Sequence, residues 1–332
     1  MPYKAIDMFQ GAGGASLGLQ NAGYEVVAAI DNDAKACETY TENLNFQPIC
    51  GDIEDYTGQD ILEHYDLKAE EIDLIIGCPP CQGFSSLRRT RYPNLEDGRK
   101  NLVKVFKDRV LRIRPKAVVF ENVSGLIKNH GIAFYEAYRR ALCDVGYTTT
   151  MKKVNAADYG VPQIRKRVIA ISVLGSEKIG FPEKTHCDPR KNQSGSEPWI
   201  TVRDTIEDLP SLQAGQAHNS IPNHVARSHK ERIMDMIKLI PHDGGNRKDL
   251  PKTYWLKCHK KLTDRRGAEN VYGRLWWDRP SGTMTCRCTT PSSGRFLHPE
   301  QNRAITPREA ARFQTFPDSF VFPSSFTQAE KQ

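Results

Sequence analysis

The stretch "DMFQGAGGASLG", residues 7–18, decides the fold, because it joins an apolar run to a helical pattern through a glycine-rich turn. Glycines at a strand-to-helix turn let the backbone approach a ligand closely, and the helix N-terminus faces the same place. The spacing differs from Gly-x-Gly-x-x-Gly, so a pyrophosphate cradle is not indicated. A turn that binds nothing would also use these glycines, and the neighbouring sequence has to decide between the two interpretations.

The first half of the chain alternates between strand and helix patterns. Apolar runs rich in Val and Ile predict strands at 4–9, 25–30, 72–77, 116–120 and 167–173. The segments between them predict helices at 15–22, 34–43, 101–113 and 132–145. This alternation predicts an α/β fold with a doubly wound parallel sheet.

The second half is organised differently. From about Gly175 the sequence becomes irregular and proline-rich, with a polar loop-like stretch "DPRKNQSGSEP" at 188–198. A chain of 332 residues is long enough for two domains. We therefore predict a sheet-based domain followed by a smaller, irregular one.

Composition indicates a cytoplasmic protein. Hydrophobic residues make up 39% and charged residues 26%, as in ordinary globular chains. No apolar run approaches the roughly 20 residues of a membrane span, and the N-terminus has no signal-peptide pattern. Nine cysteines, an odd and thinly spread number, favour a reducing compartment over a disulfide scaffold.

The positive charge is concentrated in one region. The net charge is +7, and the segment 224–274 holds 13 Lys or Arg against 6 Asp or Glu. Trp255, Trp276 and Trp277 lie in or just beyond it. A solvated basic face would explain the charge alone, whereas basic residues interleaved with aromatics favour a phosphate-backbone partner.

Two cysteines stand on a proline-stiffened turn in "IIGCPPCQGFS", residues 75–85. A redox Cys-x-x-Cys pair normally opens a helix of a thioredoxin-like domain, whereas Cys78 follows a glycine at the end of a predicted strand. The alternative is a single nucleophile with a partner acid. Glu121 ends the next predicted strand, so it should point toward the same edge as Cys81, although a carboxylate there would also serve as a helix cap. We favour the nucleophile.

Acidic residues follow other strands at this edge. Asp31 ends the second predicted strand, and Asp52 follows the short run 47–50. Either one alone would be explained as a helix cap. Together with the glycine-rich turn they lie at the carboxyl ends of successive strands, where such sheets bind ligands. An adenosine-type cofactor without a pyrophosphate is the simplest interpretation.

With these stretches, the chain resembles the DNA (cytosine-5) methyltransferases, the S-adenosylmethionine-dependent enzymes of restriction-modification systems and their relatives. The resemblance covers nearly the whole chain outside residues 176–270. Seven matching stretches occur in the family's order: "DMFQGAGGASLG" (7–18), "DNDAKACETYTENL" (31–44), "GDI" (51–53), "GCPPCQGFS" (77–85), "ENV" (121–123), "QIRKR" (163–167) and "ITPREAARFQTFPDSF" (305–320). The resemblance implies a Rossmann-like methyltransferase domain with a smaller, irregular target-recognition domain.

The resemblance also implies a catalytic set. Cys81 would add to C6 of cytosine, so that C5 can attack a methyl group. Glu121 would hydrogen-bond or protonate N3. Either Arg165 or Arg167 would lie near O2, and we favour Arg167. Because none of this is possible inside a stacked duplex, the target base must be flipped out.

The cofactor implied is S-adenosyl-L-methionine, and the segment 82–99 resembles the family's mobile active-site loop. The residues implied to line, bind or close over the cofactor are Phe9, Gly11, Gly13, Gly14, Asp31 (ribose), Asn32 (near the adenine), Asp52 and Ile53 (adenine), Pro79 and Leu102. No metal is expected, because the remaining cysteines lack the usual zinc-ligand spacing.

We expect residues 1–175 to form the catalytic and cofactor-binding domain, 176–304 the target-recognition domain, and 305–332 a C-terminal segment returning toward the first. The partner would be double-stranded DNA, bound by a monomer in a prokaryotic cytoplasm without membrane contact. The alternative is a tRNA cytosine-5 methyltransferase, since one branch of the family uses the same catalytic set on RNA. A non-enzymatic relative is disfavoured because Cys81 and Glu121 are both intact.

The sequence departs from the family at its end. Members continue past "FPDSFVF" with a Gly-Asn-Ala/Ser-Val segment, whose helix returns to the first domain beside the cofactor, whereas this sequence stops at Gln332. We expect a helix's worth of apolar surface on the first domain to lie uncovered. The sequence would then be incomplete at its C-terminus, and the chain would bind S-adenosylmethionine weakly, be prone to aggregation, or need a partner polypeptide that supplies the helix.

Overall fold

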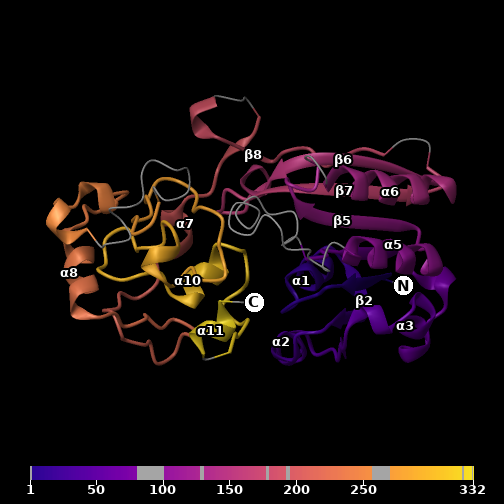
Figure 1. Ribbon diagram of the computed structural model, residues 1–332, viewed down its shortest axis with the longest axis horizontal. Helices are drawn as coiled ribbons and strands as arrows, with labels where there is room; N and C mark the ends of the chain where they lie inside the picture. The colour runs from indigo at the N-terminus through magenta and orange to yellow at the C-terminus, as the bar shows by residue number, and fades with distance from the viewer. Residues whose placement is uncertain are drawn as a thin grey trace. The chain divides into compact units, whose positions relative to one another are not determined.

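The computed structural model describes residues 2–80, 101–127, 131–176, 179–191, 195–255, 270–323, 325–330 and 332. By packing, the chain forms two compact units (Figure 1). The first comprises Met1–Val154 and Lys166–Glu183, and the second Asn155–Arg165 and Lys184–Gln332. Cys81 and the predicted active-site loop 82–99 lie outside the described residues. The functional division at 175 and 304 stays a prediction.

The first unit is built on a seven-stranded sheet with strand order β3-β2-β1-β4-β5-β7-β6. Its strands are β1 (Tyr3–Met8), β2 (Tyr24–Asp31), β3 (Ile49–Cys50), β4 (Leu74–Gly77), β5 (Ala117–Val123), β6 (Tyr147–Asn155) and β7 (Lys166–Leu174). Strand β1 pairs in parallel with β2 on one side and with β4 on the other, and β4 pairs in parallel with β5. The α/β fold is confirmed.

One strand runs against the predicted direction. β7 is antiparallel to β5, with register partners from Ala117↔Val173 to Val123↔Arg167. A parallel neighbour needs a crossover connection, usually a helix that packs on the sheet. Between β6 and β7 the chain has only residues 156–165, which belong to the second unit. The expectation of parallel pairing throughout was therefore wrong at this strand.

Helices cover both faces of the sheet. They are α1 (Gly14–Asn21), α2 (Ala34–Leu44), α3 (Gly58–His64), α5 (Leu102–Ile113) and α6 (Gly131–Asp144). Side chains of α3, α5 and α6 pack with Ile6, Ile75 and Val118 in the main core. On the opposite face Leu19 of α1 packs with alternate residues of β1, β2 and β4. This two-sided arrangement confirms the doubly wound prediction.

On the sheet face that carries α1, residues of β4, β5 and β7 are less completely buried than those that pack against α1. Ile76, Val119 and Ile171 are register partners across β4, β5 and β7, and each is only partly buried. They form an apolar row beside the cluster around Leu19. The expected helix from a partner polypeptide, which would cover such a row, stays a prediction.

The second unit is largely irregular, as predicted for the region after about residue 175. Its α-helices and strands are α7 (Val202–Ile206), α8 (Glu231–Leu239), α10 (Pro307–Arg312), α11 (Phe326–Ala329), β8 (His186–Cys187) and β9 (Glu197–Pro198). Short 3-10 helices in the two units span Ile53–Asp55, Ala69–Glu71, Ala156–Tyr159, Pro189–Lys191, Arg247–Asp249, Lys252–Tyr254 and Pro291–Ser293. The main apolar cluster of the second unit surrounds Leu275, Trp277 and Phe313.

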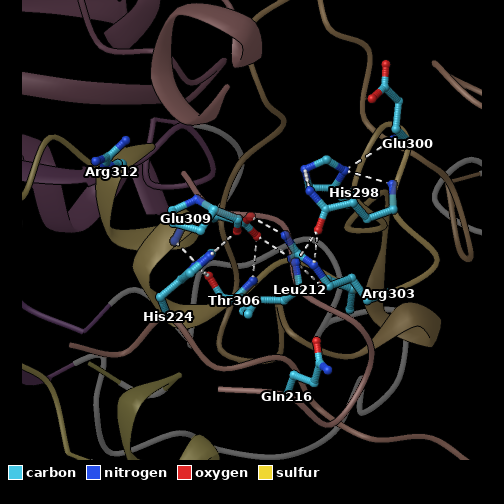
Figure 2. Close-up of polar contacts among 12 residues, drawn as sticks. Leu212, Gln216, His224, His298, Glu300, Arg303, Thr306, Glu309 and Arg312 are labelled. Carbon is cyan, nitrogen blue, oxygen red and sulfur yellow. Dashed lines mark hydrogen bonds and ion pairs between the residues drawn. The ribbon is translucent and has the colours of Figure 1, made fainter. Parts of the chain in front are cut away.

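A buried ion pair lies in this second unit (Figure 2). Arg303 donates to both carboxylate oxygens of Glu309, at 2.8 and 2.6 Å, and both side chains are almost fully buried. The N–H of Thr306 also donates to Glu309, and Thr306 contacts His224. Burial alone would raise the pKa of Glu309, but Arg303 lowers it to about 2. The pair therefore stays charged and fixes the start of α10.

No helix within the described ranges is long and apolar enough to cross a membrane.

Close packing at the end of β4 generates a prediction. A Cβ on Gly77 would lie 2.2 Å from Cε2 of Phe106, whose ring packs with Phe120 at 5.8 Å and Tyr138 at 6.2 Å. Gly77→Ala should therefore destabilise the chain by about 1–3 kcal/mol, as overpacking does. The denaturation midpoint in urea measures the effect. Gly18→Ala, where a Cβ meets nothing within 4 Å, is the matched control and should not destabilise; equal losses in both variants would contradict the packing argument.

Candidate active site

The glycine-rich turn after β1 is held in an unusual backbone conformation. Phe9, Gly11 and Gly13 all have positive φ angles, of 67°, 54° and 102°. Such angles are uncommon for a phenylalanine, and they favour glycine at the other two positions. The N–H of Phe9 donates to the carbonyl of Ile30 at 3.0 Å, and the N–H of Gly11 donates to the carboxylate of Asp31 at 2.9 Å. The turn is therefore tied to the end of β2.

The two acids predicted at the strand ends both cap backbone groups. Asp31 accepts from Gly11 with one oxygen and from the N–H of Asp33 with the other, at 2.9 Å. Asp52 accepts from the N–H of Glu54 at 3.0 Å. The helix-cap alternative is thus realised at Asp52, which is the N-cap of a 3-10 helix, whereas the N-cap of α2 is Asp33 and not Asp31. Both side chains nevertheless stay partly exposed, so a ligand can still reach them.

A cavity of about 150 Å³ lies at this edge of the sheet. Six of the ten predicted cofactor residues line it: Phe9, Asp31, Asn32, Asp52, Ile53 and Leu102. Among the described residues, Ile30, Gly51, Cys78 and Pro80 also line the cavity, whereas Gly11, Gly13, Gly14 and Pro79 do not. The cavity combines apolar walls with two carboxylates and an amide. That combination suits a planar base attached to a hydroxylated sugar.

A larger cavity of about 400 Å³ lies between α5 and α6. Its lining is mainly apolar, with Phe134 and Tyr138 on α6 and two lysines, Lys104 and Lys107, on α5. The described residues that line it include no carboxylate and none of the predicted site residues. The smaller cavity at the strand ends is therefore the better candidate.

A buried carboxyl group stabilises the glycine-rich turn through a hydrogen-bond network. Asp7, only 1% exposed, accepts a hydrogen bond from Ser16 Oγ at 2.6 Å, and Ser16 accepts from the hydroxyl of Tyr40 at 2.9 Å. Burial raises the pKa of Asp7 to about 7. The network links β1 to α1 and α2 beneath the turn. Sequence analysis missed it, although an acid inside an apolar strand is a recognisable signal.

The predicted acid and one predicted arginine lie together. Arg167 Nε is 2.9 Å from Glu121 Oε1, and both side chains are about one-fifth exposed. Glu121 lies near the end of β5 and Arg167 near the start of β7, so antiparallel pairing brings them together. Arg165 precedes β7 and belongs to the second unit, where its carbonyl accepts from the N–H of Ala156 at 2.9 Å.

A second residue of β5 holds the backbone that leads to Cys81. The side chain of Asn122 is fully buried and donates to the carbonyl of Pro79 at 3.2 Å. The N–H of Cys78 donates to the carbonyl of Met8 at 3.4 Å. These contacts anchor the Cys-Pro-Pro segment to two strands. Pro79 thus has a backbone contact within the first unit rather than a place in the cavity wall.

The tryptophans of the second unit pack against its own arginines. Arg295 and Arg279 lie over the ring of Trp276 at 3.8 and 4.6 Å. Arg247, which is buried, lies over Trp255 at 5.5 Å. This internal use of basic and aromatic residues was not foreseen.

The part of the chain that the structure describes contains no group of three His, Cys, Asp or Glu arranged to hold a metal ion.

The sheet order, the strand-end cavity and the Glu121–Arg167 pair describe an α/β fold with a candidate ligand site at its strand ends. The chain belongs to the C-5 cytosine-specific DNA methylase family, whose model matches residues 3–332. It is 33% identical to the type II methyltransferase M1.HphI of Haemophilus parahaemolyticus over 97% of this chain and 80% of that protein. Its identity to the type II methyltransferase M.NgoFVII of Neisseria gonorrhoeae is also 33%, over 99% and 81%.

Solved structures share the fold. A candidate DNA modification methyltransferase encoded within an Escherichia coli prophage superposes with a TM-score of 0.73 at 24% identity, over 99% of this chain and 92% of that one. The Dnmt2 methyltransferase of Schizosaccharomyces pombe superposes with a TM-score of 0.57 at 17% identity, over the same shares.

The buried Asp7 predicts a pH dependence of stability. Its pKa is about 3.9 in an unfolded chain and about 7 in the folded one, so its contribution is full below the lower value and is lost as pH rises toward 7. Relative to Asp7→Asn, the wild-type chain should lose about 2.5 kcal/mol of unfolding free energy between pH 5 and pH 8. Urea titrations at each pH measure this difference. Parallel profiles for the two chains would show that Asp7 is not protonated in the fold.

Proposed function

We propose that this protein transfers a methyl group to C5 of a cytosine within a short duplex DNA site, with S-adenosyl-L-methionine as methyl donor and Cys81 as nucleophile. The observation that carries the proposal is the arrangement at one sheet edge. There the strand-end cavity, the anchored Cys-Pro-Pro segment and the Glu121–Arg167 pair all lie within the first unit. Family membership supplies the class of reaction.

The cavity suits the proposed cofactor. Asp31 offers carboxylate oxygens for ribose hydroxyls, and Asp52 offers an acceptor for an exocyclic amino group. Phe9, Ile53 and Leu102 provide apolar walls for the adenine ring. When bound, the cofactor supplies an electrophilic methyl group on a sulfonium. Gly11, Gly13 and Gly14 would act through the turn that they form.

The chain's own groups would carry the chemistry on the base. The thiolate of Cys81 adds to C6 of a flipped cytosine, and Glu121 hydrogen-bonds or protonates N3 to relieve the charge that the addition places on the ring. C5 then acts as the nucleophile toward the methyl group. Loss of the C5 proton and elimination of Cys81 release 5-methylcytosine. The ion pair with Arg167 fixes the orientation of Glu121 before the base arrives.

We assign residues 1–175 to cofactor binding and catalysis, 176–304 to target recognition, and 305–332 to a C-terminal segment that returns toward the catalytic domain. Duplex DNA is favoured over tRNA because the matching family and the relatives named above are DNA or type II methyltransferases. Lys230, Arg232 and Lys252 are exposed basic residues of this region that would contact phosphates.

Bisulfite sequencing of DNA from a host that expresses the protein tests the proposal directly and reveals the recognition site. New 5-methylcytosine at one sequence context is the expected result. Methylation of tRNA with none on duplex DNA would favour the alternative. Absence of any new 5-methylcytosine with folded protein present would refute the activity.

The Glu121–Arg167 pair predicts a change in turnover rather than in cofactor binding. Arg167→Ala leaves the carboxylate without its 2.9 Å partner, and kcat should fall by about 100-fold, a typical contribution of an oriented acid or base. Arg167→Lys should retain more activity because it keeps the charge, although it loses the Nε donor. Methyl-transfer kinetics measure both variants.

Arg165→Ala is the comparison within the same motif, and its loss of kcat should be smaller. A larger loss for Arg165→Ala would reverse our preference between the two arginines. Unchanged thermal midpoints would show that the variants are folded.

Substitutions of the two cysteines of the Pro-Pro turn should have different effects on turnover. Cys81→Ser should abolish turnover while DNA binding persists, because a serine hydroxyl is far less ionised than a thiol at neutral pH. Cys78→Ser should retain turnover, and any effect should fall on the KM for the cofactor, because Cys78 lines the cavity.

Duplex DNA with 5-fluorocytosine at the target should form a covalent adduct with wild-type protein, since elimination requires loss of a C5 proton. Adduct formation by Cys81→Ser would contradict the assignment.

A further inference from the structure

Tyr40 lies against the glycine-rich turn, although the two are well separated in the sequence. Its side chain on α2 is fully buried, and its hydroxyl donates to Ser16 Oγ in the first turn of α1 at 2.9 Å. Ser16 in turn donates to the carboxylate of Asp7 at 2.6 Å. All three side chains are removed from water. The hydroxyl of Tyr40 therefore ties α2 to the helix that follows the turn.

The ring of Tyr40 also packs on the turn itself. A Cβ on Gly13 would lie 2.9 Å from Cδ2 of Tyr40 and 2.6 Å from Cδ1 of Leu44, closer than carbon atoms approach one another. The backbone of Gly13, where φ is 102°, thus lies directly on α2. The ring of Phe46 packs edge-on against Tyr40 at 6.3 Å and holds it in place.

These contacts close a loop around Asp31, whose carboxylate lines the cavity. Asp31 accepts from the N–H of Gly11 in the turn and from the N–H of Asp33 at the start of α2. Farther along α2, Tyr40 returns to the other end of the turn through Ser16. The turn and α2 therefore orient the carboxylate together, and the hydroxyl of Tyr40 fixes the spacing between them.

We propose that Tyr40 is a positioning residue for the cofactor: its hydroxyl holds the glycine-rich turn on α2 and thereby orients the Asp31 carboxylate toward the ribose of S-adenosyl-L-methionine. The identity of this ligand rests on the proposed function. The positioning of the turn does not depend on it. Among the described residues that line the cavity Tyr40 is absent, so it acts through Asp31 and not by touching the ligand.

Tyr40→Phe tests the inference, because it removes the hydroxyl and keeps the ring. Calorimetry should show a Kd for S-adenosyl-L-methionine raised about tenfold, within the range of one hydrogen bond lost from a buried network. Turnover at saturating cofactor should stay within about twofold of the wild type, since the lost interaction affects the ground state and the transition state equally. A residue that only stabilised the fold would lower the thermal midpoint without this split between KM and kcat.

The matched control is Tyr147→Phe. Tyr147 is a buried tyrosine of β6 in the same unit, and its hydroxyl donates to the carbonyl of Pro115. This variant loses a comparable hydrogen bond far from the turn in the sheet order, so its Kd should equal that of the wild type. An equal rise in Kd for both variants would overturn the inference.

A double variant identifies the route of the effect. If the hydroxyl of Tyr40 acts through Ser16, Tyr40→Phe combined with Ser16→Ala should raise the Kd no further than Ser16→Ala alone. Additive increases would contradict this route.

Amide hydrogen exchange of the cofactor-free chain tests the positioning without the ligand. Peptides that span residues 8–13 should exchange about fivefold faster in Tyr40→Phe than in Tyr147→Phe, because the turn opens more readily when it is held less firmly. Unchanged exchange together with an unchanged Kd would overturn the inference. A wild-type chain that binds no S-adenosyl-L-methionine would instead refute the proposed cofactor, and the exchange rates would still decide whether Tyr40 holds the turn.

Discussion

The pairing of β1 with both β2 and β4 is the constraint on which the site depends. Because these pairs are parallel, the carboxyl ends of three strands meet at one edge. The glycine-rich turn, Asp31 and the Cys-Pro-Pro segment each follow one of those ends. Residues far apart in the sequence thereby line one small cavity. A register shift in β1 would displace the glycine-rich turn relative to Asp31 and the Cys-Pro-Pro segment.

The carboxylates at this edge serve the fold as well as the proposed ligand. Asp31 satisfies two backbone N–H groups, one in the glycine-rich turn and one at the start of α2. Capping and ligand binding are therefore not exclusive interpretations. A carboxylate that caps backbone groups is already oriented, so less conformational entropy is lost when a ligand binds. Asn122 does the same for the segment before Cys81, since its buried amide holds a carbonyl of that segment.

Sequence patterns anticipated the sheet because buried parallel strands are continuous apolar runs. They did not reveal β6, whose polar sequence "YTTTMKKVN" suits an edge strand with little burial. Nor did they show that β7 is antiparallel, because an apolar run has the same composition in either direction. The cofactor residues that line the cavity were predicted from strand ends and resemblance. Asp7 is recognisable as an acid inside an apolar strand, but the contacts of Ser16 with Asp7 and Tyr40 arise from tertiary packing, which leaves no local pattern.

The second unit shows why charge is an incomplete guide to a partner. An irregular backbone leaves many carbonyls without helix or sheet partners, and these need donors when buried. Arg274, which is fully buried, donates to the carbonyls of Ile237 and Ile240 at the end of α8 and to others nearby. Arg308 likewise donates to three backbone carbonyls. These guanidinium groups stabilise the backbone of the second unit. Only the charges of exposed side chains can therefore attract a nucleic acid.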